Sequence, residues 1–163
     1  MRYFWRSLAF LPAILLMILI FSFSAAPGEN SSELSDGLSY QIVDAVGELP
    51  FTGWSEIQKR ELAEKLHTPL RKGAHFSEYA LLSILWVAPL GFFMKKGRIV
   101  TAFFICFLYA CTDELHQTFI PGRDGNLTDV LIDTSGASAG LILWYFLYGR
   151  RRVSMFVKKC THT

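Results

Sequence analysis

The segment Leu127–Tyr148 reads LTDVLIDTSGASAGLILWYFLY, which is long enough to cross a bilayer as one α-helix. A transmembrane helix needs about 20 largely apolar residues to span about 30 Å of hydrocarbon. Asp129 and Asp133 lie near its start, and Gly136 and Gly140 continue the same helical face. Small residues at this spacing let membrane helices approach closely. Because a carboxylate facing lipid is costly, we expect this face to pack against other helices.

Three other apolar segments precede this one. Hydrophobic residues make up 52% of the chain and charged residues 18%, whereas charged residues usually make up about 25% of a soluble domain. These values exclude a disordered chain and predict an all-α, polytopic membrane protein, a single domain over residues 1–163 with four transmembrane helices. The predicted spans are residues 4–23, 74–94, 99–118 and 128–148. The net charge of +2 gives no indication of nucleic-acid binding.

The basic residues predict the orientation of these spans, because cytoplasmic loops carry an excess of lysine and arginine. Placing both termini in the cytoplasm puts ten of the sixteen basic residues on that side, at positions 2, 6, 95, 96, 98, 150–152, 158 and 159. Residues 24–73 then form an extracytoplasmic segment with eight acidic and five basic residues. The first span also has features of a cleaved signal peptide ending at Ser24-Ala25-Ala26, although Pro27 argues against cleavage.

The extracytoplasmic segment contains two stretches of helical periodicity. Residues 35–49 place aliphatic side chains on one helical face. Residues 55–66 do the same, and we expect this second helix to end before Pro69. The pattern is typical of two amphipathic helices that lie on the outer surface of the membrane. A solvated loop with helical turns is the alternative.

Polar and ionisable residues are concentrated in the outward halves of the last three spans. With a helical rise of 1.5 Å per residue, Glu78 lies about 6 Å below the outer surface, and Asp113 and Asp133 lie about 9 Å below it. Ionisable residues inside a membrane are costly and frequently functional. We therefore predict one polar pocket that opens outward.

The outer loop between the third and fourth spans holds a single basic residue. Arg123 lies between two turn sequences, Pro121-Gly122 and Asp124-Gly125. An arginine held above a carboxylate pocket can form paired hydrogen bonds with a phosphate or a carboxylate. The predicted ligand-binding residues are Lys72, His75, Tyr79, Asp113, Gln117, Arg123, Asp129 and Asp133.

Some of these polar residues could take part in acid–base chemistry, for which histidine and carboxylate side chains are the usual groups. The candidate catalytic residues are His75, Glu78, Asp113, Glu114 and His116. Two other interpretations stay open, which are a structural network of ion pairs and a metal site. The same five residues could supply the metal ligands, but their spacing matches no standard metal motif, so the sequence predicts neither a metal nor a cofactor.

The sequence resembles the VanZ-like family in three motifs. The first is Lys72-x-x-His75-Phe76-x-x-Tyr79, and the second is Asp113-Glu114-x-x-Gln117-x-Phe119-x-Pro121-Gly122-Arg123. The third combines Asp129 and Asp133 with Gly136 and Gly140. The stretch Pro27-Gly28-Glu29-Asn30-Ser31-Ser32 is also similar to members from Gram-positive bacteria. The resemblance extends from the first span to the last. This sequence departs from the family pattern at Asp133, where the pattern often has asparagine.

The resemblance implies a multi-pass protein of the bacterial plasma membrane, and a link to the teicoplanin resistance associated with the family's namesake. The favoured function is binding of a lipid headgroup or lipopeptide in the polar pocket. The alternative function is a membrane-embedded acid/base enzyme that acts on a lipid-linked phosphate or carbonyl substrate. A third interpretation is a transporter or scaffold subunit. The expected partner is a membrane lipid or a lipid-linked envelope component, and a homo-oligomer is compatible with so short a chain.

Overall fold

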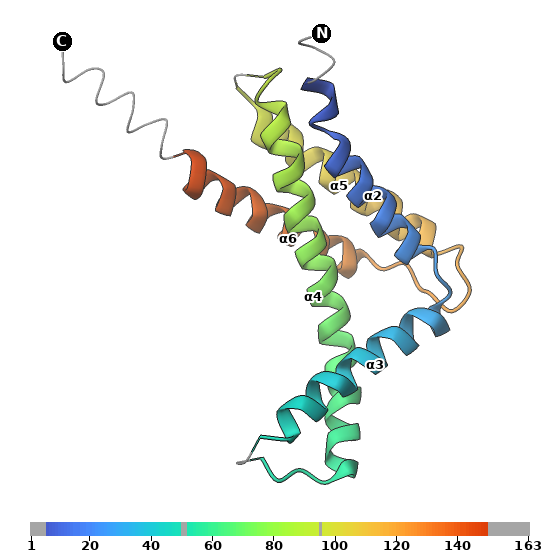
Figure 1. The fold of residues 1–163 in the computed structure, drawn as a ribbon. Coiled ribbons are helices and arrows are strands. Elements are labelled where there is room, and N and C mark those ends of the chain that lie inside the picture. The colour runs from blue at the N-terminus through green and yellow to red at the C-terminus, as the bar shows by residue number, and fades with distance from the viewer. Residues whose placement is uncertain (1–5, 50–51, 95, 150–163) are drawn as a thin grey trace, which may run out of the picture.

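The computed structural model describes residues 6–49, 52–94 and 96–149, without the side chains of residues 28–34 and 149. This part of the chain folds into helices and contains no strand, as expected for the all-α class. The helices are α2 (Leu11–Ser24), α3 (Gly28–Gly47), α4 (Glu56–Leu90), α5 (Arg98–Gln117) and α6 (Leu127–Trp144), followed by the π-helix η1 (Tyr145–Gly149). Helices α2, α5, α6 and the second half of α4 form a bundle, and α3 crosses the first half of α4 outside it (Figure 1).

Within the described residues, three helices are long and apolar enough to cross a membrane, namely Arg6–Ser24, Arg98–Gln117 and Leu127–Tyr148. They correspond to the predicted first, third and fourth spans. The predicted second span, residues 74–94, lies mainly in the second half of α4, which is not apolar enough by the same measure. The structure therefore supports three spans, and the fourth stays a prediction.

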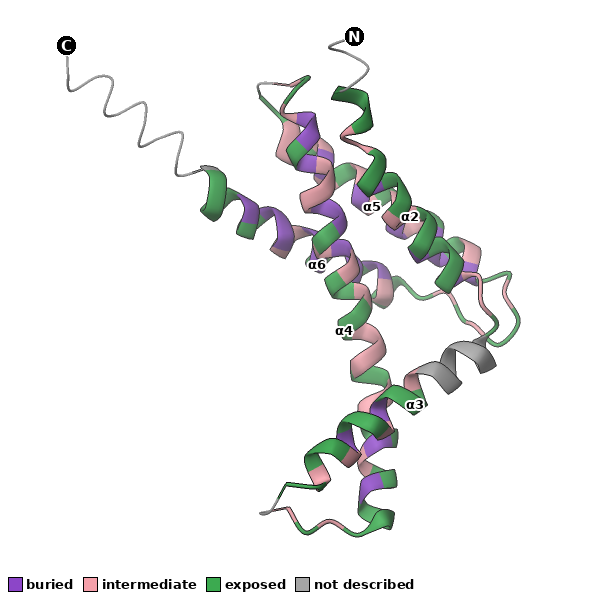
Figure 2. Cartoon of the chain, in the orientation of Figure 1, coloured by how far each residue is buried: buried purple, intermediate pink, exposed green. Residues whose placement is uncertain are grey.

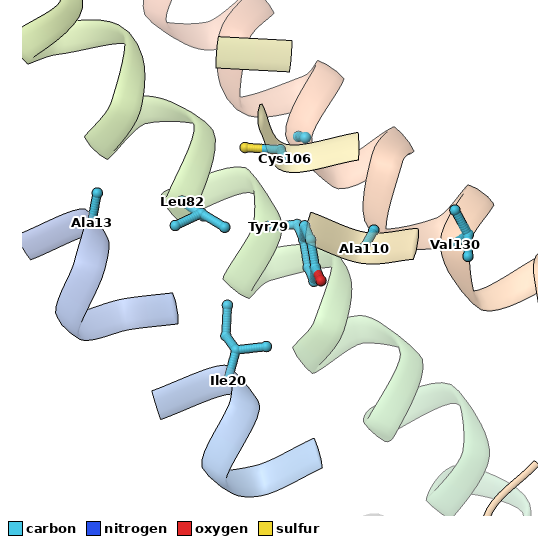
Figure 3. Close-up of a cluster of buried hydrophobic side chains, with 8 residues drawn as sticks. Ala13, Ile20, Tyr79, Leu82, Cys106, Ala110 and Val130 are labelled. Carbon is cyan, nitrogen blue, oxygen red and sulfur yellow. The ribbon is translucent and has the colours of Figure 1, made fainter. Parts of the chain in front are cut away.

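Exposed apolar side chains cover the outside of the bundle, as expected for helices that face lipid. In α2, Leu15 and Ile18 are each 57% exposed, whereas Ala13 and Ile20 are buried on the inner side. Figure 2 shows that the buried residues of α4, α5 and α6 likewise lie where these helices meet. The main core cluster consists of Ala13, Ile20, Tyr79, Leu82, Cys106, Ala110, Val130 and Ala137 (Figure 3).

Helix α4 continues through Pro69, so the predicted end of the second amphipathic helix at this residue is wrong. Proline removes one backbone donor and usually kinks or ends a helix, at a cost of about 3 kcal/mol. Here α3 packs against the first half of α4 and α6 packs against the second half. We attribute the continuity of α4 to its contacts with α3 before Pro69 and with α6 after it. A rule based on local sequence does not take such contacts into account.

The start of α4 is defined by a capping box at Ser55. The Ser55 hydroxyl accepts a hydrogen bond from the Gln58 backbone at 3.4 Å, and the Gln58 side chain accepts one from the Ser55 backbone at 2.9 Å. From there α4 runs for 35 residues, a length of about 52 Å. This exceeds the thickness of a bilayer, so the first half of α4 projects beyond the bundle toward α3 (Figure 1).

The contact between α4 and α6 is the most extensive in the bundle and depends on two glycines of α6. A Cβ atom at Gly136 would overlap the backbone of Phe76, and a Cβ atom at Gly140 would overlap the Ala80 carbonyl oxygen. The two helix backbones therefore touch directly, as in other small-residue contacts between membrane helices. This confirms the prediction that the face of α6 carrying Asp133 and both glycines packs inside the bundle.

A cluster of polar side chains attaches α3 to the first half of α4. Lys59 Nζ lies 2.6 Å from Asp44 Oδ1 and 3.1 Å from Glu56 Oε1, and the Tyr40 hydroxyl donates to Glu56 Oε2 at 2.8 Å. The hydrogen bond to Asp44 raises the pKa of Lys59, and the bond from Tyr40 lowers the pKa of Glu56. Leu38, Ile42, Val46 and Leu49 form an exposed aliphatic row along α3 and the residues that follow it.

Candidate functional site

The predicted site residues lie on three helices and one loop that converge at the same end of the bundle. Helix α4 carries Lys72, His75, Glu78 and Tyr79, helix α5 carries Asp113, Glu114, His116 and Gln117, and helix α6 carries Asp129 and Asp133. Arg123 belongs to the loop between α5 and α6. The end of α2 and the start of α3 lie at the same end of the bundle (Figure 1).

Two pairs of ionisable side chains join α4 to α6. Lys72 Nζ lies 3.3 Å from Asp129 Oδ1, and His75 Nδ1 lies 3.8 Å from Asp133 Oδ1. Asp133 is only 1% exposed, and among the described residues neither of its carboxylate oxygens has a hydrogen-bond partner. Buried polar atoms in folded proteins are nearly always paired, so unpaired ones call for an explanation.

The buried polar residues at the end of α5 organise the following loop. Gln117 Nε2 lies 3.4 Å from Asp113 Oδ2 and 3.3 Å from Glu114 Oε1. Glu114 Oε2 accepts a hydrogen bond from the Asn126 backbone at 3.0 Å, and the Asn126 side chain accepts one from Thr128 N at 3.1 Å. The second bond is an N-cap, so Glu114 and Asn126 together set where α6 begins.

Arg123 contacts the end of α2 rather than the carboxylates of the bundle. Its Nε donates to the Ala26 carbonyl and its Nη2 donates to the Phe23 carbonyl, each at 3.0 Å. These oxygens belong to the last turn of α2 and the residues after it, where carbonyls lack helical partners and a cation is favourable. Burial, and then the charge of Arg71, lowers the pKa of Arg123.

Both arginines line a pocket of about 230 Å³ between α2, α3 and α4, which we call the arginine pocket. Its apolar lining residues are Phe23, Ala26, Leu38, Leu70 and Ala74. The remaining lining residues are Ser35, Arg71, His75, Glu78 and Arg123. The sequence analysis did not predict Arg71, which shares a helical face with His75, or any lining residue from α2 and α3.

A second cavity of about 10 Å³ lies between α4, α5 and α6, and we call it the polar chamber. It is lined by Arg71, Lys72, His75, Glu114, Gln117, Asp129, Ile132 and Asp133. Arg71 and His75 therefore line both cavities. The chamber gathers most of the predicted ligand-binding residues, although it is far smaller than a lipid headgroup.

Three of the predicted residues lie elsewhere. Tyr79 is fully buried in the apolar core cluster (Figure 3). His116 packs against Phe21 of α2, with ring centroids 4.5 Å apart, and Asp113 is buried beside Gln117 without lining either cavity. Over the described ranges, no group of three or more histidine, cysteine, aspartate or glutamate side chains is arranged to hold a metal ion.

The comparisons with known proteins agree with the motifs in the sequence. A family model described as VanZ/LLP1 matches residues 9–148, which include every residue of the two cavities. The comparison with curated proteins found no match, and neither did the comparison with solved structures. With three helices able to cross a bilayer and a family match over most of its length, the chain is a membrane protein that belongs to the VanZ/LLP1 family.

Proposed function

We propose that this protein spans the bacterial plasma membrane four times and binds an anionic lipid headgroup or lipopeptide in the arginine pocket. The observation that carries the proposal is the lining of that pocket, which combines charged and apolar side chains. A lipid likewise combines a charged headgroup with apolar acyl chains. The pocket also lies at the end of α2, where a candidate span ends and a headgroup would be found.

The charges in the arginine pocket favour an anion. Arg71 and Arg123 lie near each other, and like charges brought together in a partly buried site repel unless an anion lies between them. Phosphate and carboxylate groups accept paired hydrogen bonds from guanidinium groups. Two nitrogens of Arg123 already bind the end of α2, so Arg71 is the residue whose guanidinium we assign to the ligand.

The apolar wall suits the first carbons of an acyl chain. Phe23 and Leu38 are 52% and 49% exposed, and both line the pocket. Leu38 begins the aliphatic row of α3, which continues at Ile42, Val46 and Leu49. We propose that this row lies on the outer leaflet, because it starts at the pocket and α3 begins only four residues after α2 ends.

A protein that holds envelope lipids at the outer leaflet would change which molecules can reach the outer surface of the membrane. This offers a physical route to the glycopeptide (teicoplanin) resistance linked to the VanZ-like namesake, and we propose such a contribution for this chain. The route requires the pocket to face outward.

The first prediction tests ligand binding. Replacing Arg71 by glutamine should weaken binding of phosphatidylglycerol about tenfold, since a hydrogen bond to a charged group contributes about 1.5–3 kcal/mol. Replacing Arg60, an exposed residue of the same helix, by glutamine is the matched control and should leave binding unchanged. The measurement is native mass spectrometry of detergent-solubilised protein titrated with phosphatidylglycerol, with phosphatidylcholine as the neutral comparison. Equal affinity of the Arg71→Gln and Arg60→Gln proteins would contradict the proposal.

The second prediction tests the orientation. In a variant whose three cysteines are replaced by serine, a cysteine at Gln41 should react with a membrane-impermeant maleimide in intact cells. A cysteine at Ser154 should react only after the cells are opened, because the basic C-terminal residues favour the cytoplasm. The reverse labelling pattern would show that the pocket faces inward.

A further inference from the structure

We propose that the protein hydrolyses a phosphoester of the anionic lipid in the arginine pocket, using a water molecule in the polar chamber that His75 activates. This inference rests on the proposed binding function and assigns a reaction to the same site. The decisive feature is the position of His75, which lines both cavities. Among the described residues that line the two cavities, Arg71 is the one other residue that both cavities share.

The polar chamber has the size and the lining of a site for one water molecule. A cavity needs about 10–15 Å³ and two to four polar partners to hold water, and the chamber measures about 10 Å³. Within the described part of the chain, both carboxylate oxygens of Asp133 and Nδ1 of His75 lack hydrogen-bond partners. A water molecule in the chamber would supply the missing partners.

This arrangement differs from what a purely structural ion-pair network requires. In such a network each buried charge is paired, because removing one partner of a buried pair is costly. Lys72 Nζ comes within 3.3 Å of Asp129 Oδ1, although that oxygen has no hydrogen-bond partner among the described residues. Asp133 is 1% exposed, and the nearest side chain that can carry a positive charge, His75, is 3.8 Å away. A separation of 3.8 Å exceeds a direct hydrogen bond and is compatible with a bridging water.

The proposed step balances without any further reactant. The water oxygen attacks the phosphorus of the bound phosphoester while an imidazole nitrogen of His75 accepts one of the water's protons. The bond between phosphorus and the leaving oxygen breaks, and that oxygen leaves as an alcohol after it receives the proton from His75. Arg71 holds the phosphate oxygens, on which negative charge increases during the attack.

His75 is the catalytic residue of this step, and Asp133 is a positioning residue. Asp133 orients the imidazole and stabilises its protonated form, a role that carboxylates take toward catalytic histidines. The charged or titratable residues around His75 are Arg71, Lys72 and Glu78 of α4, Glu114 of α5, Arg123 of the loop, and Asp129 and Asp133 of α6.

The test uses the full-length protein in nanodiscs that contain either phosphatidylglycerol or phosphatidic acid, in water enriched in oxygen-18. The expected result is release of a phosphate product that carries one oxygen-18 atom. His75→Gln should lower the rate at saturating lipid at least about 100-fold, which is the lower range for loss of a general base, whatever change in binding it causes as a residue of the arginine pocket. Arg60→Gln should match the parent protein in both measurements.

Asp133→Asn separates a positioning role from a structural one. Asparagine keeps the shape of the side chain but cannot stabilise a protonated imidazole, so the acidic limb of the pH–rate profile should move to lower pH. Asp133→Glu should keep the limb near that of the parent protein. An unmoved limb in Asp133→Asn would overturn the role of Asp133.

The outcomes distinguish this inference from the function on which it rests. If phosphatidylglycerol binds and neither lipid yields a labelled product, the hydrolysis is overturned and the binding function stands. If His75→Gln retains the parent rate, the assignment of His75 is overturned. If Arg71→Gln and the parent protein bind phosphatidylglycerol equally, the proposed function itself fails.

Discussion

Replacing Gly140 by leucine is expected to lower the melting temperature of the solubilised protein by about 10 °C, or to prevent its accumulation. A side chain at this position would overlap the Ala80 carbonyl oxygen and would lie 2.5 Å from the Ser83 hydroxyl. A backbone oxygen cannot move aside without separating α4 from α6. Overpacking commonly costs about 1–3 kcal/mol, and each kcal/mol shifts the melting temperature of a chain of this size by about 2–4 °C.

The matched control for this prediction is Ser135→Leu. Ser135 is an exposed residue of the same helix, so a leucine there faces outward and should leave the melting temperature within about 2 °C. The measurement is thermal unfolding in detergent, followed by light scattering or by tryptophan fluorescence. If Gly140→Leu melts like Ser135→Leu, the close contact between α4 and α6 does not exist in the solubilised protein.

Replacing Arg123 by alanine is expected to lower the melting temperature by about 6 °C and to weaken phosphatidylglycerol binding as well. The stability loss follows from two charged hydrogen bonds to the Phe23 and Ala26 carbonyls, for which we expect about 2 kcal/mol together because the site is only partly buried. The binding loss follows from the guanidinium charge at the arginine pocket. Both effects should appear in the same protein sample.

Two variants identify the cause of these effects. Arg123→Lys keeps the charge but offers no planar pair of donors, so it should recover part of the binding and little of the stability. Asp124→Asn changes an exposed charge of the same loop and should change neither. Full thermal stability of Arg123→Ala would show that the contact with α2 contributes nothing, and the arginine would then act on a ligand alone.

Several features of this protein follow from local sequence. The apolar segments determine the spans in α2, α5 and α6, because length and hydropathy govern insertion into a bilayer. Gly136 and Gly140 predict that this face of α6 packs inside the bundle, because small residues four apart let membrane helices approach closely, and the structure shows that the partner is α4. The motifs around His75 and Arg123 predict the VanZ-like family, which the match over residues 9–148 confirms.

The main error in the sequence analysis concerns α4. The rule that proline ends a helix describes an isolated segment, and it predicted a boundary at Pro69. In the folded chain α3 and α6 pack on opposite sides of that boundary, and α4 stays continuous.

The sequence by itself determined the all-helical membrane class, the family and most of the polar residues at one end of the bundle. Only the tertiary structure decided what these residues contact. Arg123 meets carbonyls about a hundred positions earlier in the chain, Leu38 and Phe23 supply the wall of the arginine pocket, and Arg71 and His75 come to line two cavities. The physical reason is that hydropathy and helical spacing act between neighbouring residues, whereas a pocket is formed by side chains from separate helices, whose distances depend on how those helices pack.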